Sequence, residues 1–293
     1  MYYIVDKICF LFSLLPLWAL YFFSDIVYFP LYYCIRYRRK IVRKNLLNAF
    51  PEKDLKVIIK IEKKFYSFFC DYIVETIKLF SISEKNIRKR ITFEGVEEVI
   101  KQMSNDKSCI LNLGHYCNWE WITTIPLHLS NNNNFSFGQI YQPLQNKLFD
   151  KLFLKIRSRF YAQNIPRKSI LRRIASMKQN NKQFVIGFIS DQTPQHSSDQ
   201  RWIDFLNQDT CVFTGAEHIA RKTQSVVFYV DIKRLKRGYY NCKFVLLSAK
   251  PHELPEYALT NMYFQHLENT IRRDPPYWLW SHNRWKRPRT IIN

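Results

Sequence analysis

The stretch Ile110–Ile125, ILNLGHYCNWEWITTI, predicts a strand, a tight turn and a helix in immediate succession. The apolar run from Cys109 to Leu113 is typical of a buried strand. Gly114 interrupts this run and His115 falls in the turn that follows. Asn118 stands where a helix N-cap belongs, ahead of the apolar run 119–125. The turn therefore brings a histidine to the junction between a strand and a helix.

His115 and Glu120 are the two titratable side chains of this junction. On one regular helix, residues five apart point about 140° away from each other, but a turn that runs into the first helical residues can bring them together. A carboxylate on one imidazole nitrogen would leave the other free to accept a proton, as a general base requires. Two interpretations remain open: this acid–base pair, or a surface histidine beside a glutamate that the helix dipole favours.

The composition describes a folded and strongly basic protein. Its 293 residues suffice for one substantial core, with or without an appendage, and 47% hydrophobic content excludes disorder. With 45 Lys and Arg against 24 Asp and Glu, the net charge is +21. Such a surplus attracts nucleic acid, an anionic membrane or phosphorylated substrates, and charge alone does not choose among them. The seven cysteines have no disulfide-framework or zinc-site spacing, which indicates a reducing compartment.

The N-terminal segment 8–35 is apolar and long enough to cross a membrane, since about 20 apolar residues span a bilayer. Asp25 is its only charge, and Pro16 and Pro30 are expected to kink it. A single span is favoured, and a re-entrant or interfacial hairpin stays open. By the positive-inside rule, the basic cluster at 36–44 places the remainder in the cytoplasm. We therefore expect a membrane anchor with a basic juxtamembrane stretch over 1–50 and a second domain over 51–293.

The rest of the chain predicts an α/β fold. A long amphipathic helix is expected over 54–80. Beyond it, short strands and helices alternate, which predicts a mixed, mainly parallel sheet flanked by helices. The expected strands are 110–113, 135–141, 184–189, 225–231 and 240–247. The expected helices are 118–129, 146–158, 169–179, 211–223 and 256–273, and the polar run 131–134 is expected to be a loop.

A set of motifs, taken in order, resembles the lysophospholipid acyltransferase superfamily. His115 and Glu120 match its HxxxxD/E block, and the later motifs resemble the branch that acylates lipid A, the late (secondary) acyltransferases of Gram-negative bacteria. These later motifs are IYQPLQNK at 140–147, RSR at 157–159, DQTP at 191–194, Phe205-Leu206 with Thr210, Thr214-Gly215, and WLWSHNRWK at 278–286. The resemblance covers essentially the whole chain and implies an acyltransferase domain over 51–293.

The resemblance implies a membrane-bound enzyme that moves a fatty acyl chain from a thioester to a hydroxyl of a lipid A precursor. His115 would be the general base and Glu120 the acid that orients it. The donor would be acyl carrier protein, or coenzyme A as in relatives, and no cofactor or metal is implied. A thioester is already activated, so proximity and proton removal supply much of the catalysis. The implied location is the inner membrane, with the catalytic domain on its cytoplasmic face.

The resemblance also implies a set of substrate-binding residues. Where the family has a tyrosine and an arginine that holds phosphate or developing charge, this chain has Tyr141 and the uncharged Gln142. Arg157 and Arg159 are candidates to replace that arginine, and Arg157 could also donate to Asp191. The full implied set is Tyr141, Gln142, Asn146, Arg157, Arg159, Asp191, Gln192 and Arg284.

Some structural alternatives stay open for these residues. Asp191 and Gln192 end the strand 184–189, where α/β folds place binding residues, although a turn that hydrogen-bonds its own backbone is equally compatible. The Trp and Arg residues of 278–286 are expected either to bury the C-terminal segment or to lie at a lipid interface, and burial is favoured.

Two other functions also remain open. The same chemistry could act on a lysophospholipid or an amino-acid lipid. Alternatively, the chain is a basic membrane-anchored binding protein without catalysis. The sequence has no Gly-rich RNA signature and no helix-turn-helix pattern, so nucleic acid is not expected as a partner.

Overall fold

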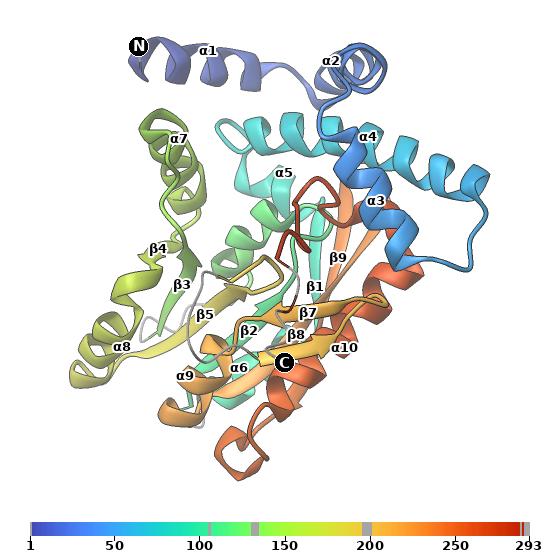
Figure 1. Ribbon diagram of the computed structural model, residues 1–293. Helices are drawn as coiled ribbons and strands as arrows, with labels where there is room; N and C mark the ends of the chain where they lie inside the picture. The colour runs from blue at the N-terminus through green and yellow to red at the C-terminus, as the bar shows by residue number, and fades with distance from the viewer. Residues whose placement is uncertain (1, 105–106, 130–134, 195–200, 288, 290–293) are drawn as a thin grey trace.

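A seven-stranded sheet forms the centre of the computed structural model, which describes residues 2–104, 107–129, 135–194, 201–287 and 289 (Figure 1). The strand order is β1-β9-β8-β2-β5-β3-β4. All neighbouring strands are parallel except β8 and β9, which are antiparallel. The predicted mixed, mainly parallel sheet is therefore confirmed. The strands are β1 (Ile91–Glu94), β2 (Cys109–Leu113), β3 (Phe135–Tyr141), β4 (Gln163–Pro166), β5 (Gln183–Ile189), β8 (Val226–Lys236) and β9 (Tyr239–Ser248).

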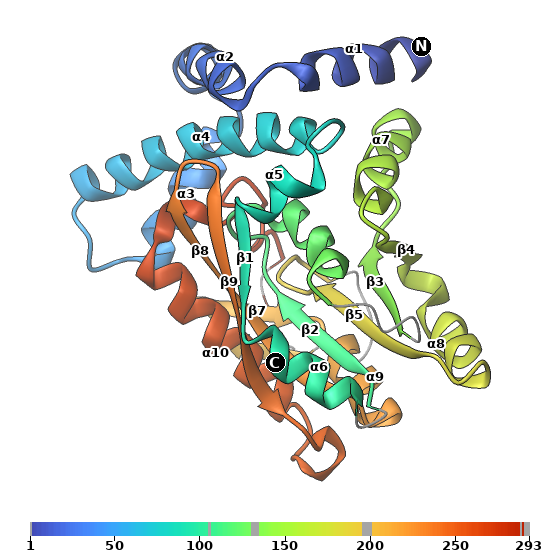
Figure 2. The ribbon, with the colours of Figure 1, turned by 180° about the vertical axis from the view of Figure 1, so that it is seen from behind.

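Helices cover both faces of this sheet. Helices α6 and α10 both contact β9 and β2, and they lie on opposite faces (Figures 1 and 2). The α-helices are α1 (Tyr2–Leu14), α2 (Leu17–Phe29), α3 (Arg39–Ala49), α4 (Leu55–Lys78), α5 (Glu84–Arg88), α6 (Val96–Ser104), α7 (Lys147–Ser158), α8 (Ile170–Gln179), α9 (Gly215–Thr223) and α10 (Ala258–Arg273). A π-helix spans Pro30–Ile35, and 3-10 helices span Trp119–Leu127, Arg167–Ser169, Pro251–Glu253 and Pro275–Tyr277.

Two of the expected helices differ from their predictions. The segment after Asn118 forms a 3-10 helix with Pro126 inside it, and a proline cannot donate the backbone bond that an α-helix needs at that position. The helix expected from Cys211 begins at Gly215. Cys211 instead pairs with Trp202, in a separate antiparallel hairpin of β6 (Arg201–Asp204) and β7 (Asp209–Val212). The polar run 131–134 lies outside the described residues.

The N-terminal segment is broken rather than straight. Helix α1 ends before Pro16, and the chain turns by 115° into α2 and the π-helix. In the described part of the chain, no single helix has both the length and the apolar composition of a membrane span, and only this bent pair meets the criteria when taken together. Helix α2 packs on α4, where Ser24 donates to the buried Asp71 at 2.7 Å.

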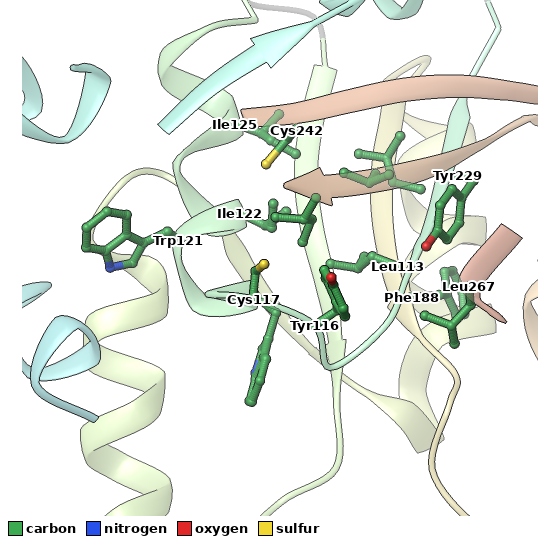
Figure 3. Close-up of a cluster of buried hydrophobic side chains, with 14 of the residues drawn as sticks. Leu113, Tyr116, Cys117, Trp121, Ile122, Ile125, Phe188, Tyr229, Cys242 and Leu267 are labelled. Atoms are coloured by element: carbon green, nitrogen blue, oxygen red, sulfur yellow. The ribbon is translucent and has the colours of Figure 1, made fainter. Parts of the chain in front are cut away.

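Strand β2 is buried along its whole length and lies between β5 and β8. Side chains from β2, β5, β8, β9, α10 and the 3-10 helix gather around it in one hydrophobic core, part of which is drawn in Figure 3. The parallel register pairs Leu113 of β2 with Ile189 of β5. The residues that follow these two strands therefore emerge side by side at one edge of the sheet.

Candidate active site

His115 and Asp191 meet where β2 and β5 end. The distance from His115 Nδ1 to Asp191 Oδ1 is 2.5 Å. The other carboxylate oxygen, Oδ2, accepts the backbone N–H of His115 and the indole N–H of Trp278, each at 2.8 Å. Asp191 is only 1% exposed, whereas the His115 side chain is 18% exposed. The carboxylate is thus held by three donors behind a partly accessible imidazole.

The protonation of this pair follows from its surroundings. Burial by itself raises the pKa of Asp191, but the His115 imidazole and the hydrogen bonds from His115 and Trp278 outweigh burial and lower this pKa to about 2. Because Asp191 is ionised at neutral pH, it accepts the proton on His115 Nδ1. The lone pair of a neutral imidazole is then on Nε2.

Gln192 approaches this second nitrogen. Its side-chain Nε2 lies 3.1 Å from His115 Nε2. An amide N–H can donate to the Nε2 lone pair only if Nδ1 carries the imidazole proton, so this contact agrees with the tautomer that Asp191 selects. The Gln192 amide therefore donates to the same Nε2 lone pair that would accept a proton from a substrate.

The prediction that Glu120 orients His115 does not match these contacts, because Asp191 occupies that place. Glu120 is buried and forms a bidentate ion pair with Arg157. Arg157 Nε donates to Glu120 Oε2 at 2.7 Å, and Arg157 Nη2 donates to Glu120 Oε1 at 2.5 Å. Burial alone lowers the pKa of Arg157, but the Glu120 carboxylate more than reverses this effect and the pKa lies above its usual value. Glu120 also accepts the indole N–H of Trp119. The Trp119 ring packs edge to face against the His115 imidazole, with the ring centres 5.1 Å apart. Trp119 thus contacts both Glu120 and His115.

Of the other predicted site residues, some line a cavity and the rest make contacts within the fold. Tyr141 and Gln142 lie at the end of β3 and line a cavity together with Gln192. Arg157 is held by Glu120 rather than donating to Asp191, which corrects that prediction. The remaining three predicted residues make structural contacts: Asn146 accepts backbone N–H groups as the N-cap of α7, Arg159 donates to the Leu79 carbonyl, and Arg284 is 2% exposed and donates to the Cys211 carbonyl.

The cavity beside the His115–Asp191 pair has a volume of about 600 Å³, within the usual range for a small-molecule site. Gln192, which contacts the imidazole, forms part of its wall. Polar and apolar groups contribute similar shares of the wall. The apolar share comes from β3, β5, β7, α8, α9 and the residue between β7 and α9: Ile140, Ile170, Phe188, Ile189, Val212, Phe213, Ala216 and Ile219. Gln192 therefore links the imidazole to a cavity that offers both apolar and polar walls.

The C-terminal segment contacts both His115 and Asp191, and its role was only partly predicted. Burial of the tryptophans is confirmed, since Trp278 is 3% and Trp280 is 0% exposed. The backbone N–H of Leu279 donates to the His115 carbonyl at 3.0 Å. Trp278 was not predicted to contact the site, although its position in a dense aromatic motif singled it out. Its hydrogen bond to Asp191 makes it a direct support of the carboxylate.

Gly114 lets Leu267 and Asp191 pack close to the backbone of the turn, and we expect Gly114→Ala to disrupt this packing. An added Cβ would lie 2.5 Å from Leu267 Cδ1 and 3.3 Å from Asp191 Oδ2. Leu267 is fully buried in the core, so its movement is costly. Overpacking of this kind costs about 1–3 kcal/mol, and it should displace Asp191 from the imidazole. Thermal unfolding and kcat measure the two effects. Gly187→Ala on β5 is the control because its added Cβ would make only ordinary van der Waals contacts, at 3.8 Å and 3.9 Å, and the residue does not line the cavity. An equal effect of both variants would contradict this explanation.

In the described part of the chain, no group of three or more His, Cys, Asp or Glu side chains is placed to hold a metal ion. The His115 ring instead contacts the Asp191 carboxylate, the Gln192 amide and the Trp119 ring. These groups suit proton transfer at the imidazole.

Comparison with known proteins identifies one family. A comparison with curated proteins finds no match. The family model described as bacterial lipid A biosynthesis acyltransferase matches residues 1–287, which is nearly the whole chain. That match includes both strands that carry the His115–Asp191 pair and the C-terminal segment that supports it. The chain therefore belongs to the bacterial lipid A biosynthesis acyltransferase family and is an acyltransferase.

Proposed function

We propose that this protein transfers a fatty acyl chain from an acyl thioester to a hydroxyl of a lipid A precursor, with His115 as the general base and Asp191 as the residue that orients it. The observation that carries the proposal is the contact of His115 Nδ1 with a buried, ionised carboxylate, beside a cavity of about 600 Å³ that has an apolar side. The family membership supports the lipid A acceptor over a lysophospholipid or an amino-acid lipid.

The proposed reaction uses one proton transfer in each direction. The acceptor hydroxyl replaces the Gln192 amide at His115 Nε2 and gives up its proton as its oxygen attacks the thioester carbonyl. Asp191 stabilises the imidazolium that forms. The carbon–sulfur bond then breaks, and the leaving thiolate takes the proton from Nε2 to become a thiol. The imidazole returns to its neutral state, so the cycle closes without an acyl-enzyme.

We further propose that the N-terminal helices attach the enzyme to the cytoplasmic face of the inner membrane. Large apolar side chains of α1, α2 and the π-helix are exposed: Tyr3, Ile4, Ile8, Phe10, Leu11, Leu14, Trp18, Phe22, Phe23, Ile26, Val27, Phe29, Tyr33 and Ile35. A contiguous apolar surface of this size is typical of a lipid or protein contact. Arg36, Arg38 and Lys40 follow directly and are exposed, which suits anionic lipid head groups.

A direct assay tests the proposed function. Membranes that contain the full chain would be incubated with a lipid A precursor and a radiolabelled acyl chain, presented either on acyl carrier protein or on coenzyme A. The expected product is the precursor with one additional acyl chain, identified by mass spectrometry. No product with either donor would contradict the proposal. Acylation of a lysophospholipid in preference to the lipid A precursor would identify a different acceptor.

Through its contacts with Arg157 and Trp119, Glu120 would hold the surroundings of His115 in place rather than take part in the proton transfer. A double-mutant cycle with Arg157 tests this positioning role. Glu120→Gln leaves the guanidinium with an uncharged partner, so the free energy of unfolding should fall by about 1–3 kcal/mol. Because both side chains act through one ion pair, adding Arg157→Gln should cost less than the sum of the two single changes. Chemical denaturation measures this coupling. Additive losses, or a kcat loss as large as that of His115→Ala, would contradict the positioning role.

A further inference from the structure

One long segment of the chain carries only positive charge. Between Asp150 and Asp191 the sequence has no aspartate or glutamate. Its basic residues are Lys151, Lys155, Arg157, Arg159, Arg167, Lys168, Arg172, Arg173, Lys178 and Lys182. Within this segment, α8 and the 3-10 turn before it expose Arg167, Lys168, Arg172 and Arg173 around Leu171, which is 55% exposed. These five side chains are called the α8 basic surface below.

The α8 basic surface is continuous with the wall of the cavity. Arg167 lines the cavity, and so does Ile170 at the start of α8. The Arg167 guanidinium lies over the ring of Phe213, another wall residue, at 4.5 Å from the ring centre. On the other side, Arg172 and Arg173 border a shallow hollow of about 460 Å³ beside β4. A molecule held on α8 would therefore lie at the rim of the cavity.

The position of α8 argues against a membrane as the partner of this surface. Figures 1 and 2 both place α1 and α2 at one end of the molecule and α8 near the other end. A lipid surface that contacts α1 and α2 would not reach α8. This placement favours a soluble, negatively charged partner that approaches the end of the molecule away from α1 and α2.

We propose that the α8 basic surface docks an acidic protein that carries the acyl thioester, and that the acyl chain enters the cavity past Arg167. This inference rests on the proposed function, in which a carrier-bound thioester is the donor. Opposite charges attract such a partner from a distance and orient it. Leu171 supplies an apolar contact among the basic side chains. The lipid acceptor and the acyl donor would then approach the enzyme from different sides.

Two donors that differ only in the carrier test this proposal with the full chain in detergent micelles. One donor is the acyl carrier protein thioester, and the other is the same acyl chain on pantetheine. Lys168→Glu combined with Arg172→Glu changes two exposed side chains that do not line the cavity. The KM for the carrier donor should rise about tenfold or more, with kcat nearly unchanged, while turnover of the pantetheine donor stays at the wild-type level.

A matched control makes the same change in charge elsewhere. Lys101→Glu combined with Lys243→Glu alters exposed lysines on α6 and β9, where each forms only a surface ion pair. This control should keep the wild-type KM for both donors. Added salt should raise the wild-type KM for the carrier donor, and the Lys168→Glu/Arg172→Glu variant should respond less because its docking charges are reversed.

Each other outcome overturns the docking proposal. A wild-type KM for the carrier donor in the Lys168→Glu/Arg172→Glu variant would overturn it and leave the proposed acyl transfer intact. Equal losses with both donors would mean that these side chains support the cavity rather than the carrier. Use of the pantetheine donor but not the carrier donor by the wild type would exclude carrier docking. If the wild type acylates the lipid from neither donor, the proposed function fails and the docking proposal fails with it.

Discussion

His115→Ala is expected to lower kcat for acyl transfer by about 10²–10⁴-fold, the usual contribution of a general base. The variant removes an imidazole whose Nδ1 contacts a buried carboxylate and whose Nε2 contacts Gln192 in the cavity wall. Its fold should remain intact because the backbone contact from Leu279 to the His115 carbonyl does not depend on the side chain. Acyl transfer to the lipid A precursor measures the effect.

His252→Ala is the matched control for this change. The His252 side chain is 43% exposed on a 3-10 helix and does not line the cavity. Its removal should leave kcat unchanged. Transfer activity that survives His115→Ala at the level of this control would show that His115 is not the base, and the proposed mechanism would then be wrong.

Asp191→Asn is expected to be almost as damaging, with a loss of about 10²–10⁴-fold in kcat, because it selects the wrong imidazole tautomer. Two donors, the His115 backbone N–H and the Trp278 indole, point at Asp191 Oδ2. The asparagine oxygen must take this position, so its NH₂ group faces His115 Nδ1. The imidazole then accepts at Nδ1 and carries its proton on Nε2. The nitrogen that faces the substrate can no longer accept a proton.

The tautomer itself provides a second readout for this variant. Nitrogen NMR shifts of His115 should indicate a proton on Nδ1 in the wild type and on Nε2 in Asp191→Asn. Asp204→Asn on the exposed end of β6 is the control and should change neither the shifts nor kcat. An unchanged tautomer together with full activity in Asp191→Asn would contradict the role of Asp191.

Much of the fold could be predicted because its patterns are local. The strand Phe135–Tyr141 was predicted with the observed ends, and the strand, turn and helical segment around His115 follow one another as expected. The missed strands are short or lie at edges. Strand β4 contains Pro166 and pairs on one side only, which leaves little periodicity to detect. Cys211 was assigned to a helix because the apolar run 211–213 lies close to α9, although Thr214, the N-cap residue of α9, separates the two.

The sequence by itself determined the local setting of His115, the proposed base: an apolar strand, a glycine turn, the histidine and a helical segment all lie within a few residues of one another, so local chemistry suffices to place them. It also located Asp191 and Gln192 at the end of a strand. Only the tertiary structure decided which acid serves the imidazole. Glu120 is near His115 in sequence, but its carboxylate is neutralised by Arg157. Asp191 is 76 residues away in the chain and meets His115 because β2 and β5 are parallel neighbours in register. Strand adjacency depends on how the whole sheet packs, and no local pattern encodes it.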